Sequence, residues 1–218
     1  MRFKTFTTLL LTAGVLVGAP EARAQMTKDH MAAPAMSMSG GDLRVALNNL
    51  LAEHAELGLA ATGAALRGQT AEFQAAAGAL DANSVALSQA IGSVYGHGAE
   101  EAFLALWRKH IGFIVDYTTG VATKDQPKAD KAVNDLLGYT RDFGAFLSSA
   151  NPNLPTAVVA DLVKGHVVGF KAAIDAQAKG DWVTAFARTR EAVMHMQMIA
   201  DPLAGAISKQ FPERFASR

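Results

Sequence analysis

The sequence predicts an all-α fold: a six-helix up-down bundle built from three repeated antiparallel helical hairpins. The first observation behind this prediction is a repeat. His54, His110 and His166 are spaced 56 residues apart, and the same apolar pattern surrounds each of them. The second observation is composition, because alanine is abundant whereas aromatic residues make up only 7% of the chain. That bias favours helix over strand.

Each repeat histidine lies on the apolar face of one predicted helix and is followed by a second helical pattern. Apolar residues stand seven, four and three positions before the histidine, and others stand 26, 33 and 37 positions after it. Both spacings line up on one face of an α-helix. The preceding residues are Leu47, Leu50, Leu51, Phe103, Leu106, Trp107, Val159, Leu162 and Val163. The following residues are Leu80, Leu87, Ile91, Leu136, Phe143, Leu147, Ala192, Ile199 and Leu203.

The helix boundaries follow from turn and breaker residues. The turns within the three hairpins are Gly68-Gln69, Lys124-Asp125 and Gly180-Asp181. The breaks between hairpins are Tyr95-Gly96-His97-Gly98 and Asn151-Pro152-Asn153-Leu154-Pro155. In chain order the helices are expected at 42–67, 70–94, 99–122, 126–149, 156–179 and 182–208. Because one hairpin cannot bury its apolar face alone, the three should pack into a single domain over 42–210, followed by a tail over 211–218.

Residues 1–24 have the pattern of a secretory signal peptide. Arg2 and Lys4 give a positive start, Leu9 to Gly18 form a short apolar run, and Ala22-Arg23-Ala24 is a small-x-small cleavage site. The apolar run is too short to span a bilayer, and an interfacial anchor helix is the competing interpretation. We therefore expect a periplasmic or secreted protein without a membrane span. The chain contains no cysteine, which excludes disulfides and thiolate metal sites.

The segment 25–41 is short, lacks a helical period and ends in Ser-Gly-Gly, so we expect it to be disordered. It concentrates methionine and histidine, and flexible thioethers can capture Cu(I) with modest affinity. A linker with incidental methionines is the alternative. The candidate ligands are Met26, His30, Met31, Met36 and Met38.

In an antiparallel hairpin, residues equidistant from the turn face each other. This places Asn83 opposite His54, Tyr139 opposite His110, and His195 opposite His166. Asn and Tyr can hydrogen-bond an imidazole, so the first two pairs are expected to be buried polar contacts that specify the fold.

The third pair indicates a metal site. Two imidazoles on facing helices are a common start of such a site in helical bundles. Met194 and Met198 lie near His195 on one helix face, and thioether sulfur selects Cu(I). The sequence therefore predicts a copper site formed by His166, His195, Met194 and Met198, with Met196 assigned to packing. A plain turn of a core helix is the alternative for this stretch.

Several function classes find no support. Lys plus Arg equals Asp plus Glu at 20 each, so nothing indicates nucleic-acid binding. No nucleophile–base set, phosphate loop or carboxylate pair stands out, and we expect no enzyme.

The stretches that resemble known proteins are LWRKHIGFIVDYT, SSANPNLP and MHMQMIADPLAGAI. Through these stretches, the block from Asp42 to Ile207 resembles a family of uncharacterised secreted bacterial all-helical repeat proteins. The Met/His-rich lead is similar to mobile segments of periplasmic copper-resistance proteins.

The sequence thus predicts an exported metal-binding protein that buffers Cu(I) or transfers it to a periplasmic copper transporter or cuproprotein. The alternative is a non-catalytic structural or interaction module of the envelope, in which the buried histidines only specify the fold.

Overall fold

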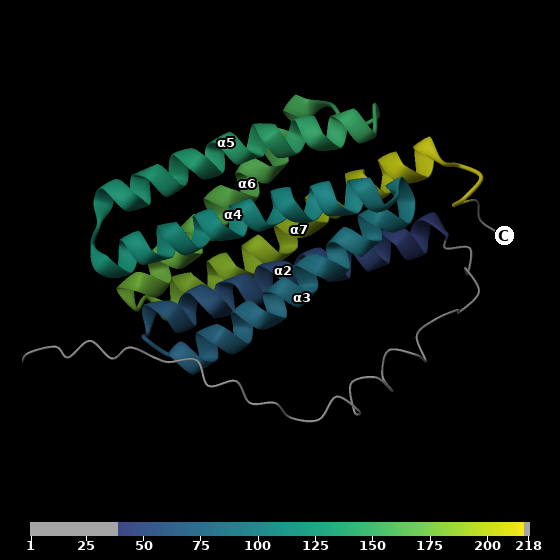
Figure 1. Cartoon of the computed structure of the whole chain (residues 1–218). Helices are drawn as coiled ribbons and strands as arrows, with labels where there is room; N and C mark the ends of the chain where they lie inside the picture. The colour runs from purple at the N-terminus through teal and green to yellow at the C-terminus, as the bar shows by residue number, and fades with distance from the viewer. Residues whose placement is uncertain (1–38, 216–218) are drawn as a thin grey trace, which may run out of the picture. The chain divides into compact units, whose positions relative to one another are not determined.

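The computed structural model describes residues 39–215, and these form six α-helices without a strand. This confirms the predicted all-α class and the six-helix architecture (Figure 1). The helices are α2 (Gly40–Leu66), α3 (Thr70–Tyr95), α4 (His97–Thr123), α5 (Gln126–Ala150), α6 (Thr156–Lys179) and α7 (Trp182–Gln210). The predicted leader over 1–24 and the candidate ligands up to Met38 lie outside the described residues.

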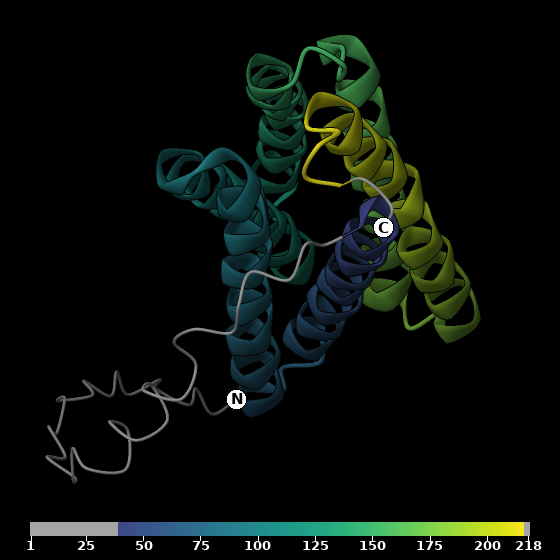
Figure 2. The same ribbon diagram turned by 90° about the vertical axis from the view of Figure 1, so that its right-hand side faces the viewer.

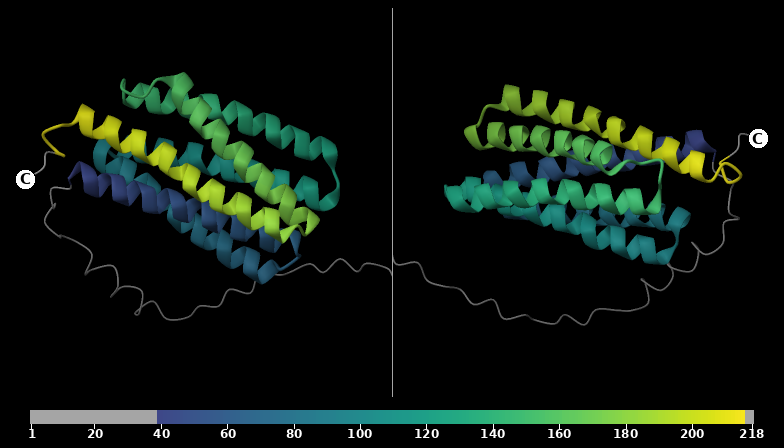
Figure 3. Two further views of the ribbon diagram at one scale, coloured as in Figure 1. Left: turned by 180° about the vertical axis from the view of Figure 1, so that it is seen from behind. Right: turned by 90° about the horizontal axis from the view of Figure 1, so that it is seen from above.

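The three hairpins close into a ring. Each helix packs on the next along the chain, and α7 returns to pack against α2, as Figures 2 and 3 show. The first helices of the hairpins, α2, α4 and α6, also contact one another and form the centre. Each second helix, α3, α5 or α7, bridges two of these inner helices. Because the hairpins repeat in sequence, equivalent positions on the inner helices face one common axis.

Side-chain caps fix where several helices begin. Ser39 accepts a hydrogen bond from the Asp42 backbone, and the Asp42 carboxylate accepts one from the Ser39 backbone, which is a capping box. Helix α2 therefore starts at Gly40, inside the stretch that the sequence assigned to a disordered segment. Asp125 and Asp181 cap α5 and α7 in the same way, by accepting from backbone N–H groups.

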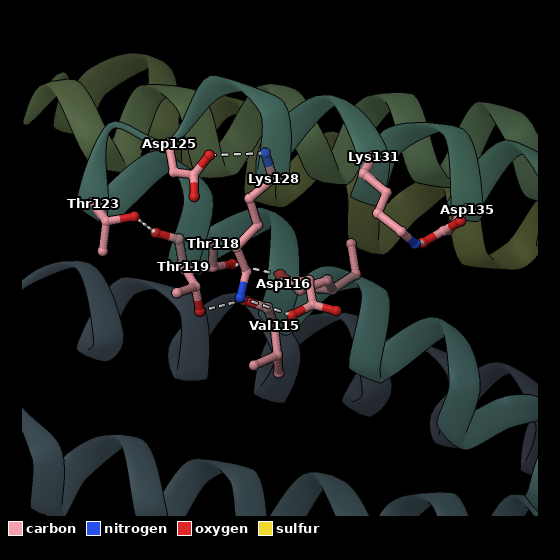
Figure 4. A network of polar contacts seen from close by, with 10 residues as sticks. Val115, Asp116, Thr118, Thr119, Thr123, Asp125, Lys128, Lys131 and Asp135 are labelled. Atoms are coloured by element: carbon pink, nitrogen blue, oxygen red, sulfur yellow. Dashed lines mark hydrogen bonds and ion pairs between the residues drawn. The ribbon is translucent and has the colours of Figure 1, made fainter.

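The turn between α4 and α5 shows how a hairpin is closed (Figure 4). Lys124 ends α4 in the left-handed conformation, with φ 59°. Asp125 then accepts from the Lys128 backbone at 3.0 Å. The Lys128 ammonium reaches back to Asp116 on α4, at 3.2 Å. In the third hairpin, Gly180 takes the left-handed position with φ 68°, a conformation that glycine adopts without strain.

The segment after α7 packs against the start of the bundle. Phe211 and Phe215 are partly buried against the core. Arg214 donates to the backbone carbonyls of Ser93 and Val94 at 2.9 and 3.0 Å. The Gly40 backbone donates to the carbonyl of Phe215 at 3.3 Å. The residues to Phe215, which the sequence left as a tail, thus hold the ends of α2 and α3.

Among the residues that the structure describes, no helix is long and apolar enough to cross a membrane. Helix packing relies on apolar side chains and on small residues where backbones approach closely. At Gly120 an added Cβ would lie 2.7 Å from the Ala129 backbone nitrogen.

We expect Gly120→Ala to destabilise the protein by about 1–3 kcal/mol, because the backbone of α5 cannot move aside. Gly112→Ala on the same helix is the matched control, since nothing lies within 4 Å of its added Cβ. It should stabilise by about 0.5–1 kcal/mol through helix propensity. Urea denaturation of both variants measures the effects. Equal changes in the two would contradict the close approach of α4 and α5.

Candidate functional site

The three repeat histidines meet at the centre of the bundle. His54 lies on α2, His110 on α4 and His166 on α6. These three residues are only 3%, 4% and 8% exposed, respectively. The Nε2 atoms of His54 and His110 lie 3.4 Å apart. The ring centroid of His54 lies 5.3 Å from that of His110 and 6.0 Å from that of His166. We call these three residues the histidine cluster.

The 56-residue spacing contained the signal for this arrangement. Spacing within one hairpin pairs each histidine with a residue of that hairpin. When a threefold repeat closes into a ring, three equivalent positions on three inner helices also converge. The repeat therefore indicates a cluster across hairpins rather than within them.

Burial keeps the imidazoles neutral. It lowers the pKa of His166 to about 3, with the neighbouring His54 and His195 adding to the effect. It likewise lowers the pKa of His110 to about 3, helped by His166 and opposed weakly by the Trp107 backbone. The pKa of His54 falls well below its ordinary value for the same reason, burial first and His110 second. Neutral imidazole is the form that binds metals.

Several hydrogen-bonding atoms of the histidine cluster have no partner in the described part of the chain. Within residues 39–215, the Nδ1 atoms of all three histidines are buried without a partner of hydrogen-bond geometry. A buried polar group left unpaired costs about 1–3 kcal/mol. Natural cores rarely accept this cost unless the group has another role.

Aromatic rings surround the cluster. Trp107 lies 4.8 Å from His54 and 4.6 Å from His110 between ring centroids. Tyr139 lies 4.9 Å from His110, with the rings tilted by 31°. The Tyr139 hydroxyl has no partner in the described part of the chain, and burial raises its pKa well above the ordinary value. The expected His110–Tyr139 hydrogen bond is thus replaced by a ring contact.

The expected His54–Asn83 contact also differs from the structure. The Asn83 amide donates to the Leu50 carbonyl at 2.9 Å and to the Glu53 carboxylate at 2.6 Å. Asn83 does lie at the predicted level along the hairpin, because Leu50 lies one turn before His54. The predicted contact with the imidazole is absent, since His54 points to the central axis whereas Asn83 comes from the outer helix α3.

The third hairpin repeats this contact. His195 Nε2 pairs with the Leu162 carbonyl at 2.9 Å, and Leu162 precedes His166 as Leu50 precedes His54. His195 also packs against Gly165, where an added Cβ would lie 2.9 Å from its ring. One ring nitrogen of His195 is therefore engaged by the backbone of α6.

The methionines around His195 do not join His166. Met194 and Met198 are 59% and 55% exposed, so the face that they share looks outward. Met196, which the pattern assigned to packing, is buried in the core. It lines a small void of about 20 Å³ together with His110 and His166. The predicted ligand set is not brought together because a helix turns positions 194 and 198 away from the face of 196.

A larger cavity of about 380 Å³ also borders the cluster. It lies among α2, α3, α4 and α6, and all three cluster histidines line it. Across residues 39–215, no group of three or more His, Asp or Glu side chains is already arranged to hold a metal ion. The three cluster histidines lie near one another but do not form such a group.

Comparison with known proteins gives no match to a family, to a curated protein or to a solved structure.

Proposed function

We propose that this protein binds a transition-metal ion, Cu(I), at the histidine cluster. The observation that carries the proposal is the 3.4 Å separation of the His54 and His110 Nε2 atoms. Imidazole nitrogens bind such metals at about 2.0 Å, so two nitrogens that share one ion in tetrahedral geometry lie about 3.3 Å apart. Two neutral imidazoles aimed at each other at this distance are suited to a shared ion.

His166 supplies the third ligand in this proposal. Its ring is farther from His54 than that of His110, so it must turn towards the pair to complete the site. Its Nδ1 has no hydrogen-bond partner within the described residues that would oppose this turn. A metal bond at the His166 Nδ1 would pair that nitrogen, whereas the Nδ1 atoms of His54 and His110 would stay unpaired because their Nε2 atoms face the ion.

The surroundings favour copper over harder cations. In the linings of the two cavities that touch the cluster, the carboxylate is that of Asp81, and it is paired with Arg108. Magnesium, calcium and manganese prefer oxygen ligands, so the site disfavours them. Met196 lies beside His110 and His166 and offers a soft thioether, which selects Cu(I). The role as an exported copper buffer or copper donor rests on the Met/His-rich lead and on the signal-like pattern of residues 1–24.

X-ray absorption at the copper edge tests the proposal on protein loaded with one equivalent of Cu(I). We expect a copper shell dominated by nitrogen at about 2.0 Å. A shell of sulfur alone would assign the copper to the exposed methionines or to the lead and would contradict the cluster. Absence of tight copper binding would favour the alternative, in which the buried histidines only specify the fold of a structural module.

A further inference from the structure

The cavity beside the histidine cluster is a second candidate binding site in the molecule. It has a volume of about 380 Å³, within the range of small-molecule sites in proteins. Its walls are almost wholly apolar, and they come from α2, α3, α4 and α6. The cluster histidines lie on the side of the bundle axis, and Asp81 and Arg108, both exposed, lie towards the surface.

Several small residues of the first hairpin line this cavity. At three equivalent positions the first hairpin has alanine, at Ala61, Ala65 and Ala77, and all three line the cavity. The second hairpin has larger residues at the same positions: Tyr117, Val121 and Val133. The third has Ala173, Gln177 and Thr189. At these three positions the first hairpin therefore carries less side-chain volume than the second.

The lining restricts the charge of an occupant. Asp81 and Arg108 are the charged residues of the lining, and they neutralise each other through two hydrogen bonds of 2.8 and 2.9 Å. The hydroxyls of Thr118 and Thr119 already donate to backbone carbonyls of α4 (Figure 4). No unpaired charged side chain thus remains among the described residues of the lining to recognise a charged organic molecule.

The histidines supply a polar end. His54, His110 and His166 are more than nine-tenths buried, and each has a ring nitrogen without a hydrogen-bond partner in residues 39–215. We propose that the cavity binds a small, uncharged, largely apolar molecule whose single polar group faces these imidazoles. The proposal does not depend on the metal, so its test uses metal-free protein.

The test is a fluorescence titration with N-phenyl-1-naphthylamine, a neutral apolar probe, in the presence of a metal chelator. We expect saturable binding of one probe per chain. Ala77→Leu fills the cavity and should weaken binding at least about tenfold, because the added side chain takes the place of the probe. Ala75→Leu is the matched control: it makes the same change on the same helix, at an exposed position outside the lining. It should bind as the unaltered protein does.

Two further variants serve as a substitute for Ala77→Leu and as a control for probe binding elsewhere on the protein. Ala65→Leu fills the cavity from α2 and replaces Ala77→Leu if circular dichroism shows that the latter does not fold. Phe186→Ser removes an apolar side chain of α7 that is largely exposed and lies outside the cavity. Loss of probe binding in Phe186→Ser, equal binding by the Ala75 and Ala77 variants, or absence of saturable binding would each overturn the proposal.

Discussion

The metal-free protein should lose stability steeply as the pH falls from 6.5 towards 3. The unfolded chain carries histidines with a pKa near 6.5, whereas burial holds those of His110 and His166 at about 3 in the folded state. Between these values the unfolded chain binds more protons, so acid favours unfolding. The stabilisation is fully present above pH 6.5 and is lost as the pH falls. His110 and His166 each contribute on the order of 1 kcal/mol per pH unit within this window, and His54 acts in the same direction.

Urea denaturation at pH 7.5 and pH 5.0, with a chelator present, measures this effect. Between pH 6.5 and 5 most carboxylates stay ionised, so the histidines dominate the change. Replacing one cluster histidine, in His166→Leu, should reduce the dependence measurably, because one of the groups that share it is removed. Replacing the exposed His97, in His97→Leu, should leave the dependence nearly intact. A stability that does not change with pH in the unaltered protein would show that the histidines are not buried together.

His166→Leu should separate copper binding from stability. His166 makes no hydrogen bond within the described residues and has a buried unpaired nitrogen, so an apolar residue of similar volume suits its site. At pH 7.5 we expect the metal-free variant to be as stable as the unaltered protein or more stable, by up to about 2 kcal/mol. We expect its Cu(I) affinity to fall by about 100-fold or more, since a ligand is lost.

Competition with a Cu(I) chelator and urea denaturation, run side by side, measure both effects. His97→Leu is again the control, because its side chain is 78% exposed and lies far from the cluster in the first turn of α4. The structural alternative predicts the opposite pair of results for His166→Leu: lower stability with unchanged copper affinity. The double change His195→Asn, Met198→Leu should keep most of the copper affinity, because these side chains lie outside the cluster.

The six helices could be predicted from sequence because apolar period and turn chemistry agree in all three hairpins. The predicted start of α2, at residue 42, is two residues later than the observed start at Gly40. The capping box of Ser39 and Asp42 lies at the edge of the segment that was expected to be disordered. Packing between hairpins was harder to predict. The repeat gives equal levels along each hairpin, but it does not say which helix of a pair faces the centre.

Because the repeat does not say which helix of a hairpin faces the centre, the predicted contacts at the site differ from the observed ones. Asn83 and His195 were placed at the correct level, yet both contact the backbone of the facing helix one turn before the histidine. Met194 and Met198 do share a helix face, and the helix period alone could not tell that this face looks outward. The convergence of His54, His110 and His166 follows once α2, α4 and α6 are known to be the inner helices.

The most direct test of the cluster is nuclear magnetic resonance of protein with ¹⁵N-labelled histidine during addition of Cu(I), which is diamagnetic. The central claim is that one ion is shared by three histidines of three hairpins. With up to one equivalent of Cu(I), the imidazole nitrogens of His54, His110 and His166 should shift together, while His97 and His195 stay nearly in place. Shifts confined to His195 and His30, with the three cluster signals unchanged, would contradict the account.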